Sequence, residues 1–561
     1  MQIRLQQINS TVGDIDGNFN LIKTALKNAE TEGIDLLILP EMVLTGYPVQ
    51  DLIEKEFFRE YCYKLNKKIV ELTGSTALLF GTVTPNTGKA GRKMFNSALL
   101  ARSGELLGTV HKTLLPTYDV FDDLRYFESN KEFACLELDG VKLGVTICED
   151  IWYNENEHQY HLYDVDPAAE LKKRGADLII NVSASPYTKT KHENRLRMLQ
   201  NHAKRLNLPV LYSNQVGSHT EIIFDGDSLA LDADGELVER TIPFEADYTD
   251  VEYNSESSAV KSNEKQKKPD YPESRDERHF MAICQGMRDY FDKTGLGKNV
   301  VLGLSGGIDS ALVTALAVEA LGKEHVTAIT MPGEFSSEGS VTDSELLAEN
   351  LGIVLHNIPI SEINNRFLDS LKTLFKDKPF GTAEENLQSR IRGTLLMAYA
   401  NKFNAFLLAT GNKSEYAVGY STLYGDMNGA LAPIGDLYKT EVYSLAKWMN
   451  KELYGKEVIP EAIIFKEPSA ELRPDQKDSD SLPDYEILDD ILERYIERQQ
   501  GAGTIASEGK YVADTVRKVI KLVDNNEFKR YQAAPILKVS SKSFGVGRRW
   551  PIVQNWTGHE F

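Results

Sequence analysis

The amino-acid sequence predicts an α/β protein built from two large domains. Short apolar runs alternate with longer amphipathic stretches in both halves of the chain, and one strongly charged segment separates the halves. Such alternation is typical of strands joined by helical crossovers. The chain has 561 residues, of which 42% are hydrophobic and 26% charged, and this is the composition of a globular protein.

The charged segment at residues 261–278 predicts a linker. Its sequence, KSNEKQKKPDYPESRDER, contains two prolines and no aliphatic residue, so it has little to bury in a core. We therefore expect a first domain at residues 1–250, a linker at residues 251–279 and a second domain at residues 280–561. A second polar stretch, residues 467–485, interrupts the second domain.

The composition also excludes several classes of protein. The chain has 63 Lys and Arg residues against 83 Asp and Glu residues, a net charge of −20, whereas a general nucleic-acid binder needs a basic surface. The N-terminus has no apolar signal segment, and no apolar run is long enough to span a membrane. Four separated cysteines without a CxxC pair argue against a disulfide scaffold or the usual zinc sites. We expect a cytoplasmic protein that binds neither nucleic acid nor membrane.

Four apolar runs in the first half predict buried strands that end in polar or reactive residues. These runs are IDLLILPE, GVKLGVTICED, GADLIINVSAS and LPVLYSNQVGS. Ligands in α/β sheets gather at the carboxyl ends of strands. Glu41, Cys148 and Ser185 therefore occupy positions where we expect a functional site.

Cys148 is the candidate nucleophile of this half. An isolated cysteine is most often a buried structural residue, whereas a nucleophilic one needs a base or a cation that generates the thiolate. His158 and His161 lie in a polar insertion and do not suit that role. A Glu acting as general base, with a Lys that stabilises an anionic intermediate, is the alternative. Glu41 and Lys112 are available for these two roles.

The segments LLILPEMVLTGYP, GTVHKTLLPTYDVFDD and GVTICED together resemble the Glu-Lys-Cys triad of the nitrilase superfamily, over residues 1–245. The resemblance implies an αββα sandwich in which Glu41 is the general base, Lys112 stabilises the intermediate and Cys148 forms a covalent thioester. It also implies a further acidic residue near the triad. Asp122 and Asp123 are both candidates for that place.

The second half contains the motif GLSGGIDS at residues 303–310, between an apolar strand and a helical run. The motif lacks the Lys of a Walker A loop. As a GxSxG nucleophile elbow, it would need a downstream His, but His325, His356 and His559 lie in no segment that resembles a triad loop. A plain glycine-rich turn between a strand and a helix is a further alternative.

The same motif resembles the SGGxDS pyrophosphate loop of the ATP-pyrophosphatases, which implies a Rossmann-like parallel sheet. Glycines allow a close approach of the backbone, and the N–H groups at the helix start bind pyrophosphate. The resemblance implies ATP as a co-substrate and Mg²⁺ held by Asp309, whose oxygens suit that ion. The implied ATP contacts are Gly303, Leu304, Ser305, Gly306, Gly307, Ile308, Asp309 and Ser310.

Further segments of the second half resemble the NAD synthetases. They are ENLQSRIRG from residue 385, LLATGNKSEYAVGYSTLYGD from residue 407, PIGDLYKTEV from residue 433 and the polar stretch at residues 467–485. The resemblance implies deamido-NAD contacts by Asn386, Glu415 and Lys529, an ATP contact by Thr410, and a magnesium site shared by Glu415 and Asp309. Asn386 and Thr410 also fit helix-cap or turn positions. The polar stretch is either a solvated linker or a lid that keeps water from an acyl adenylate.

The order of the two halves resembles the glutamine-dependent NAD synthetases over nearly the full length. The resemblance implies adenylylation of deamido-NAD by ATP, followed by displacement of AMP by ammonia that is released from glutamine. Free ammonia is mostly protonated at neutral pH and would be lost to solvent, so we expect a buried route between the two sites. It further implies glutamine contacts by Tyr118, Ser185 and Lys191, and a homo-oligomer. Two alternatives remain open: a carbon–nitrogen hydrolase fused to a domain that activates another acid or a tRNA base, and a nucleotide sensor without turnover.

The C-terminal segment at residues 529–550 carries six Lys or Arg residues and no Asp or Glu. Nucleic acid could explain such a segment, but it contains no nucleic-acid-binding motif. We expect it to meet the phosphates of ATP and of the dinucleotide.

Overall fold

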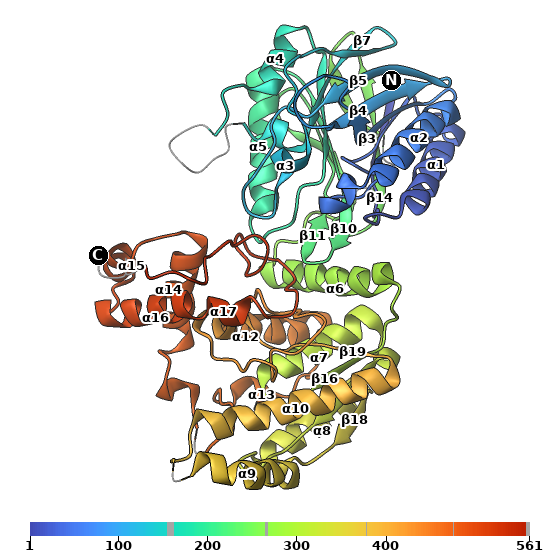
Figure 1. Ribbon diagram of the computed structural model, residues 1–561. Helices are drawn as coiled ribbons and strands as arrows, with labels where there is room; N and C mark the ends of the chain where they lie inside the picture. The colour runs from blue at the N-terminus through green and yellow to red at the C-terminus, as the bar shows by residue number, and fades with distance from the viewer. Residues whose placement is uncertain (154–161, 264–267, 377, 475, 557–561) are drawn as a thin grey trace. The chain divides into compact units, whose positions relative to one another are not determined.

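The computed structural model describes residues 1–153, 162–263, 268–376, 378–474 and 476–556. It divides into two compact units, unit 1 (Met1–Pro272) and unit 2 (Glu273–Phe561), and each is an α/β structure (Figure 1). The expected α/β class is therefore confirmed. None of the helices in the described ranges is long and apolar enough to cross a membrane.

Unit 1 contains two mixed β-sheets. The first runs in the order β15-β14-β1-β2-β3-β4-β5 and the second in the order β13-β12-β9-β8-β7-β6. The strands of the first sheet are β1 (Gln2–Gln7), β2 (Leu36–Ile38), β3 (Ala77–Pro85), β4 (Met94–Arg102), β5 (Glu105–His111), β14 (Asp247–Asn254) and β15 (Ala259–Ser262). Those of the second are β6 (Leu136–Leu138), β7 (Val141–Ile147), β8 (Leu178–Ser183), β9 (Val210–Asn214), β12 (Leu229–Leu231) and β13 (Leu237–Arg240). A separate hairpin joins β10 (Val216–His219) to β11 (Ile222–Asp225).

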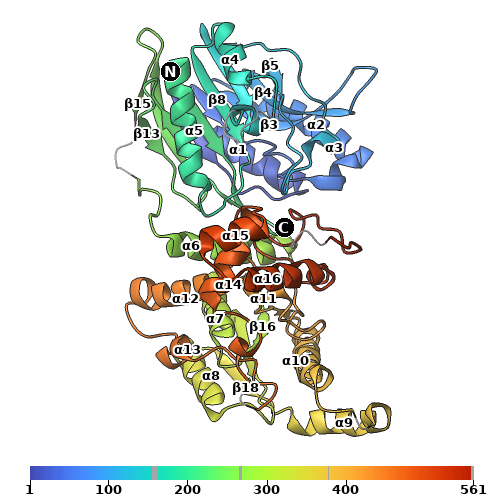
Figure 2. The same cartoon turned by 90° about the vertical axis from the view of Figure 1, so that its left-hand side faces the viewer.

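The alternation of side chains along the strands builds the layers of unit 1. Along β2, Leu36 and Ile38 belong to the core between the two sheets, whereas Leu37 belongs to the core beneath the helices. A strand that is apolar on both faces fits this place, because successive side chains point to opposite faces. The helices are α1 (Ile15–Thr31) and α2 (Glu56–Leu72) on the first sheet, and α4 (Pro167–Lys173) and α5 (Lys191–Leu206) on the second (Figure 2). The expected αββα sandwich is confirmed.

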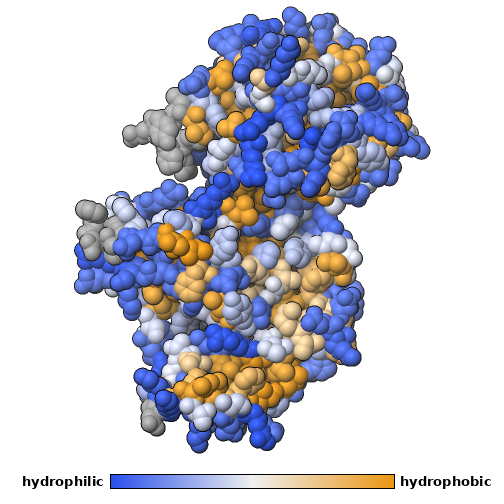
Figure 3. Space-filling view, viewed as in Figure 1, coloured by the Kyte–Doolittle hydropathy of each residue, from blue (hydrophilic) through white to orange (hydrophobic). Residues whose placement is uncertain are grey.

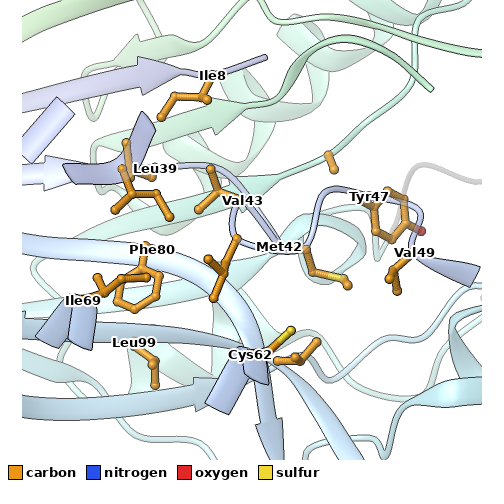
Figure 4. Packing of buried hydrophobic residues seen from close by; sticks show 14 of the residues in the cluster. Ile8, Leu39, Met42, Val43, Tyr47, Val49, Cys62, Ile69, Phe80 and Leu99 are labelled. Carbon is orange, nitrogen blue, oxygen red and sulfur yellow. The ribbon is translucent and has the colours of Figure 1, made fainter. Parts of the chain in front are cut away.

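The core between the first sheet and its helices also holds the loop that follows β2. Met42, Val43 and Tyr47 come directly after Glu41 and are buried in this core with Cys62 of α2 and Phe80 of β3 (Figure 4). The loop is therefore anchored by its apolar residues. This packing fixes the position of the Glu41 carboxylate, at the start of the loop.

The expected linker, residues 251–279, contains regular structure. It includes the end of β14, all of β15 and the start of α6 (Arg275–Thr294). Val251 and Tyr253 alternate with polar residues and are buried between the sheets, because β14 pairs with both β1 and β15. The polar residues that alternate with Val251 and Tyr253 in β14 contribute to the polar composition of this segment.

Unit 2 has a parallel four-stranded sheet in the order β18-β17-β16-β19. Its strands are β16 (Val300–Gly303), β17 (Val326–Thr330), β18 (Val354–Asn357) and β19 (Phe406–Leu407). The order reverses at β16, whose neighbours are β17 on one side and β19 on the other. In open parallel sheets, ligands bind at such a reversal, beyond the carboxyl ends of the strands.

Helices cover both faces of this sheet. They include α7 (Ile308–Leu321), α8 (Glu338–Leu351), α9 (Ser361–Phe375), α10 (Thr382–Phe403) and α12 (Lys439–Trp448). α7 and α10 lie on opposite sides of β16 in both views (Figures 1 and 2). A further group packs around one apolar cluster: α11 (Lys413–Val418), α14 (Tyr485–Leu492), α15 (Ala502–Gly509), α16 (Ala513–Asn525) and α17 (Glu527–Arg530).

Candidate functional sites

Three buried charged side chains meet in unit 1, each placed by the end of a strand or the start of a helix. Glu41 follows β2, Lys112 follows β5, and Asp123 begins α3 (Asp123–Tyr126). Lys112 Nζ lies 2.8 Å from Glu41 Oε1 and 2.7 Å from Asp123 Oδ2. Burial opposes the charge on Lys112, but the two carboxylates outweigh that penalty and hold its pKa well above the usual range.

The structure distinguishes the two candidates for the additional acid. Asp123 contacts Lys112 and accepts a hydrogen bond of 2.9 Å from Tyr47 Oη, whereas Asp122 precedes α3 at its N-cap position. The side chain of Asp123 is 5% exposed. Asp123 therefore occupies the place beside the triad.

Two further donors, one on each oxygen, hold the carboxylate of Glu41. Asn96 Nδ2 donates to Oε1 at 2.7 Å, and the backbone N–H of Ala184 donates to Oε2 at 2.9 Å. Gly81 of β3 lies beneath, where a Cβ would stand 2.5 Å from Glu41 Cα. The carboxylate is thus held in one orientation, and Ser185, next to Ala184, borders the same site.

Cys148 lies at the end of β7, in a 3₁₀ turn (Cys148–Ile151), with φ at +45°. Burial raises the pKa of its thiol, the charge of Glu41 raises it further and that of Lys112 opposes both. Asp150 holds this turn against the segment after Lys112, because its carboxylate accepts the N–H groups of Thr113 at 2.9 Å, Leu114 at 2.7 Å and Ile147 at 3.0 Å. Asp150 therefore holds both the turn that carries Cys148 and the segment that follows Lys112.

Glu149 forms a second charged centre beside the cysteine. Tyr118 Oη and Tyr163 Oη each donate to its carboxylate at 2.9 Å. Burial raises the pKa of Glu149, and the positive charge of Lys191 acts against that shift. Lys191 Nζ also lies 4.4 Å from the centre of the Trp152 ring. Two of the predicted glutamine contacts, Tyr118 and Lys191, thus face the same buried carboxylate.

The glycine-rich loop of unit 2 is held by its own serines. Ser310 Oγ lies 3.2 Å from the Ser305 N–H and donates to Gly307 O at 3.0 Å. Gly306 has φ at +74°, and a Cβ there would stand 2.5 Å from Ser340 O, in α8. Only glycine fits both the backbone angle and the close approach. The loop leads into α7, whose first N–H groups face the end of the sheet.

A cavity of about 280 Å³ opens at this end of the parallel sheet. The predicted ATP contacts line it, apart from Gly306, and so does Glu415; these are Gly303, Leu304, Ser305, Gly307, Ile308, Asp309, Ser310 and Thr410. Three cations that the sequence analysis did not identify, Arg392, Lys439 and Lys466, line it as well. Asn386 and Lys529 are not among the residues that line it. Asn386 accepts a hydrogen bond from the lining residue Thr422.

Asp309 and Glu415 converge on one cation. Lys439 Nζ lies 2.5 Å from Asp309 Oδ2 and 3.5 Å from Glu415 Oε1. Asn412 Nδ2 donates to the other oxygen of Asp309 at 2.8 Å. Burial raises the pKa of Glu415 to about 8, the charge of Asp309 adds to the shift and Lys439 opposes it. Two partly exposed carboxylates placed around one positive charge fit a divalent cation.

Magnesium is commonly held by one or two carboxylates together with substrate phosphates. Among the described residues, no group of three or more His, Cys, Asp or Glu side chains could hold a metal ion. The pair of Asp309 and Glu415 therefore fits a metal that completes its coordination with phosphate and water, not one enclosed by protein.

The polar stretch at residues 467–485 forms part of the cavity wall; residue 475 lies outside the described ranges. Glu471 accepts hydrogen bonds from Ser340 Oγ and Lys466 Nζ, both at 2.9 Å. These contacts hold the start of the stretch beside α8.

The cationic C-terminal segment, residues 529–550, makes internal contacts. Lys529 Nζ donates to the carbonyls of Gly419 and Ser421 at 2.7 and 2.9 Å. Arg530 donates to the carbonyls at the end of α11, and Lys538 to Ser540 O. Cations suit these places because the last carbonyls of a helix have no partners within it. No residue of this segment lines the described cavity, whose lining includes the cations Arg392, Lys439 and Lys466.

Several contact-making residues of both sites carried no local signal in the sequence. Glu149 and Asp150 follow Cys148 directly, and their roles depend on the φ of the turn. Lys439 lies in the segment PIGDLYKTEV but far along the chain from Asp309. His158, His161 and His559, considered above as bases, lie outside the described residues.

Each unit matches a known protein family. Residues 2–259 match the carbon-nitrogen hydrolase family and residues 279–533 match the NAD synthase family. The chain is 46% identical to the glutamine-dependent NAD(+) synthetase of Synechocystis sp., with 98% of each chain covered. It is 40% identical to that of Thermotoga maritima, with 99% of each covered. Among solved structures, it resembles the glutamine-dependent NAD+ synthetase of Acinetobacter baumannii in complex with ADP, at a TM-score of 0.77 and 36% identity over 99% of both chains.

Proposed function

The chain belongs to the glutamine-dependent NAD(+) synthetase family, and from this premise we propose how its residues divide the reaction between the two units. The reaction converts deamido-NAD, ATP and glutamine into NAD, AMP, pyrophosphate and glutamate. Unit 1 releases ammonia from glutamine, and unit 2 activates the carboxylate that ammonia attacks. The observation that carries this division is the pair of separate charged centres, at Lys112 and at Lys439.

In unit 1, Cys148 attacks the side-chain amide of glutamine. Its buried thiol is protonated at rest, because its pKa is raised, so the attack needs a base at the moment of reaction. Glu41 takes that proton and passes it to the departing ammonia. Lys112 stabilises the oxyanion of the tetrahedral intermediate, and Asp123 keeps the ammonium group in place. Water then hydrolyses the thioester to glutamate, with Glu41 again as base.

The second centre of unit 1 suits the charged end of glutamine. A free amino acid carries an ammonium and a carboxylate on one carbon. Glu149 is the acceptor for the ammonium, and Lys191 is the cation for the carboxylate; the charges of these two residues already act on each other. Tyr118 orients Glu149, and Ser185 borders the triad. Recognition of both charges would favour free glutamine over a glutamine residue within a protein.

In unit 2, the nicotinate carboxylate of deamido-NAD attacks the α-phosphate of ATP, and pyrophosphate leaves. The loop at residues 303–310 and the start of α7 bind the pyrophosphate part of ATP through backbone N–H groups. Thr410, Lys439 and Lys466 line the same cavity, and the two lysines offset the phosphate charge. Ammonia then displaces AMP from the adenylate. Of the implied deamido-NAD contacts Asn386, Glu415 and Lys529, Glu415 lines the cavity. Asn386 and Lys529 would act on the substrate through the segment at residues 419–422, which they hold by hydrogen bonds.

Asp309 and Glu415 are the residues that would hold Mg²⁺, which supplies charge neutralisation at the phosphates when bound. Lys439, which now lies between them, neutralises the same two carboxylates. The cytoplasm, where ATP is made, is the location that we propose. Four free cysteines agree with a reducing compartment.

Substitution of Cys148 tests this division of the reaction between the two units. Cys148→Ala should abolish NAD formation from glutamine and leave NAD formation from added ammonium intact. Cys135→Ala, a change at a half-buried cysteine of the same unit, is the matched control and should keep both activities. Conversely, Asp309→Asn should abolish both routes to NAD and leave pre-steady-state release of glutamate in place. Loss of the ammonium-dependent route in Cys148→Ala would disprove the division.

A homo-oligomer formed through α9 and α10 is the assembly that we propose. α9 has no buried residue, and Figure 3 shows an apolar patch over the lower part of unit 2, where these helices lie. Leu374 is 73% exposed and Phe403 is 59% exposed. Patches of this kind mark protein interfaces. Light scattering should give a multiple of 62.9 kDa for the native chain and a smaller mass for Leu374→Glu; a monomeric native chain would contradict the proposal.

A further inference from the structure

The last aromatic residue before unit 2 is buried in unit 1. Tyr271 stands two residues before Glu273, where unit 2 begins, and only 7% of it is exposed. Its segment, KPDYPES, forms no strand or helix. Pro269 and Pro272 flank it, and proline has no N–H to donate to a sheet. Tyr271 supplies side-chain contacts that hold this segment against unit 1.

Tyr271 contacts the start of α5 directly through His192 and indirectly through Asp225. Its ring stacks on that of His192, with ring centres 4.1 Å apart and planes at 8°. Its hydroxyl donates to Asp225 Oδ2 at 2.8 Å, and Asp225 Oδ1 lies 2.8 Å from Nη2 of the fully buried Arg195. His192 and Arg195 are three residues apart and share one face of the helix. Lys191 begins that helix.

Further contacts fix the position of the ring itself. The guanidinium of Arg240, in β13, lies 5.5 Å from the ring centre, and Phe244 lies 6.3 Å from it. Phe244 in turn packs against Tyr187, two residues after Ser185. Tyr271 therefore contacts residues that pack against two segments, 185–187 and 191–195. Both segments carry proposed glutamine contacts.

We propose that Tyr271 is a positioning residue for glutamine binding, through which the chain that leads into unit 2 sets the place of Lys191. The proposal rests on the proposed function of unit 1. It assigns Tyr271 no contact with glutamine. Loss of the ring would let the first turn of α5 shift and would weaken the capture of the glutamine carboxylate, whereas Cys148, Glu41 and Lys112 would keep their geometry.

The effect should appear in KM and not in kcat. Tyr271→Ala removes the stack and the hydrogen bond, and should raise the KM for glutamine by about tenfold. Tyr271→Phe keeps the stack and should raise it by about threefold. In both, kcat at saturating glutamine and the rate with ammonium should stay unchanged. A purely structural defect would instead lower the active fraction, and hence kcat.

Tyr253→Ala is the matched control, because Tyr253 is a buried tyrosine of the same unit in the core between the sheets. It should not alter the KM for glutamine. Lys191→Met tests the proposed function separately, and should raise this KM more than Tyr271→Ala. An unchanged KM in Lys191→Met would overturn glutamine binding by that lysine. A raised KM in Lys191→Met with an unchanged KM in both Tyr271 variants would overturn only the positioning role. Should Tyr271→Ala not fold, Tyr271→Phe still decides.

Discussion

Asp123→Asn removes one of the two carboxylates that hold Lys112. In the native site, Lys112 Nζ lies at nearly equal distances from Asp123 Oδ2 and Glu41 Oε1, 2.7 and 2.8 Å. The asparagine keeps the volume and one acceptor oxygen but loses the charge. Lys112 keeps Glu41 as its partner and is then free to move toward it, away from the position where the oxyanion forms.

The size of the effect follows from the kind of contact that is lost. A hydrogen bond to a charged group contributes roughly 1.5–3 kcal/mol. The full penalty for an unpaired buried charge does not apply, because Glu41 still neutralises Lys112. A loss of about 2 kcal/mol in the transition state corresponds to a fall of about thirtyfold in the rate. We therefore expect kcat for glutamine hydrolysis to fall by that factor.

Glutamate release measures the effect, and NAD formation from ammonium serves as the internal standard for unit 2. Asp122→Asn is the matched control, since it removes the same charge one residue away, outside the contacts of Lys112. It should change kcat by less than about twofold. Equal effects of the two substitutions would refute the reasoning, because they would mean that net charge matters and that contact with Lys112 does not.

Two further predictions concern the glycine-rich loop of unit 2 and the protonation of His202. Gly306→Ala should lower NAD formation from ammonium at least about tenfold and leave glutamate release unchanged, since the new Cβ would stand 2.5 Å from Ser340 O. Gly295→Ala has a similar positive φ but nothing within 4 Å, and should affect neither assay; equal losses in both variants would point to φ alone. His202 is buried, and burial with the charge of Arg205 lowers its pKa to about 4. Its protonation therefore opposes folding. The contribution of neutral His202 to the free energy of unfolding is fully present above pH 6.5. About 3 kcal/mol of this free energy is lost as pH falls from 6.5 towards 4. Denaturant unfolding across this range should show a flatter pH dependence in His202→Gln, and an unchanged slope would contradict the assignment.

Much of the fold could be predicted from the sequence because its signals are local. A strand buried on both faces is apolar throughout, and a glycine-rich loop between a strand and a helix carries its own conformational requirement. Both kinds of signal identified the sheets and the loop at residues 303–310. Glu41 and Cys148 each follow a strand, as the expectation that ligands gather at strand ends predicted. Lys112 follows a strand as well, but it was identified by its fit to a Glu-Lys-Cys set and not by its position.

The contacts that depend on distant parts of the chain could not be predicted. Whether Asp122 or Asp123 reaches Lys112 depends on where a one-turn helix begins. Lys439 is separated from Asp309 by 130 residues, and no periodicity links them. The cationic segment at residues 529–550 has the composition of a phosphate site, yet composition does not distinguish a cation that meets phosphate from one that meets helix carbonyls.

The lysine between Asp309 and Glu415 has a consequence for how unit 2 is made in the cell. Asp309 and Glu415 lie close together and are mostly shielded from solvent, so their charges would repel each other without a counter-ion. Lys439 supplies the counter-ion from within the chain. We therefore expect unit 2 to fold without a divalent cation, so that removal of the proposed Mg²⁺ would leave the folded unit intact.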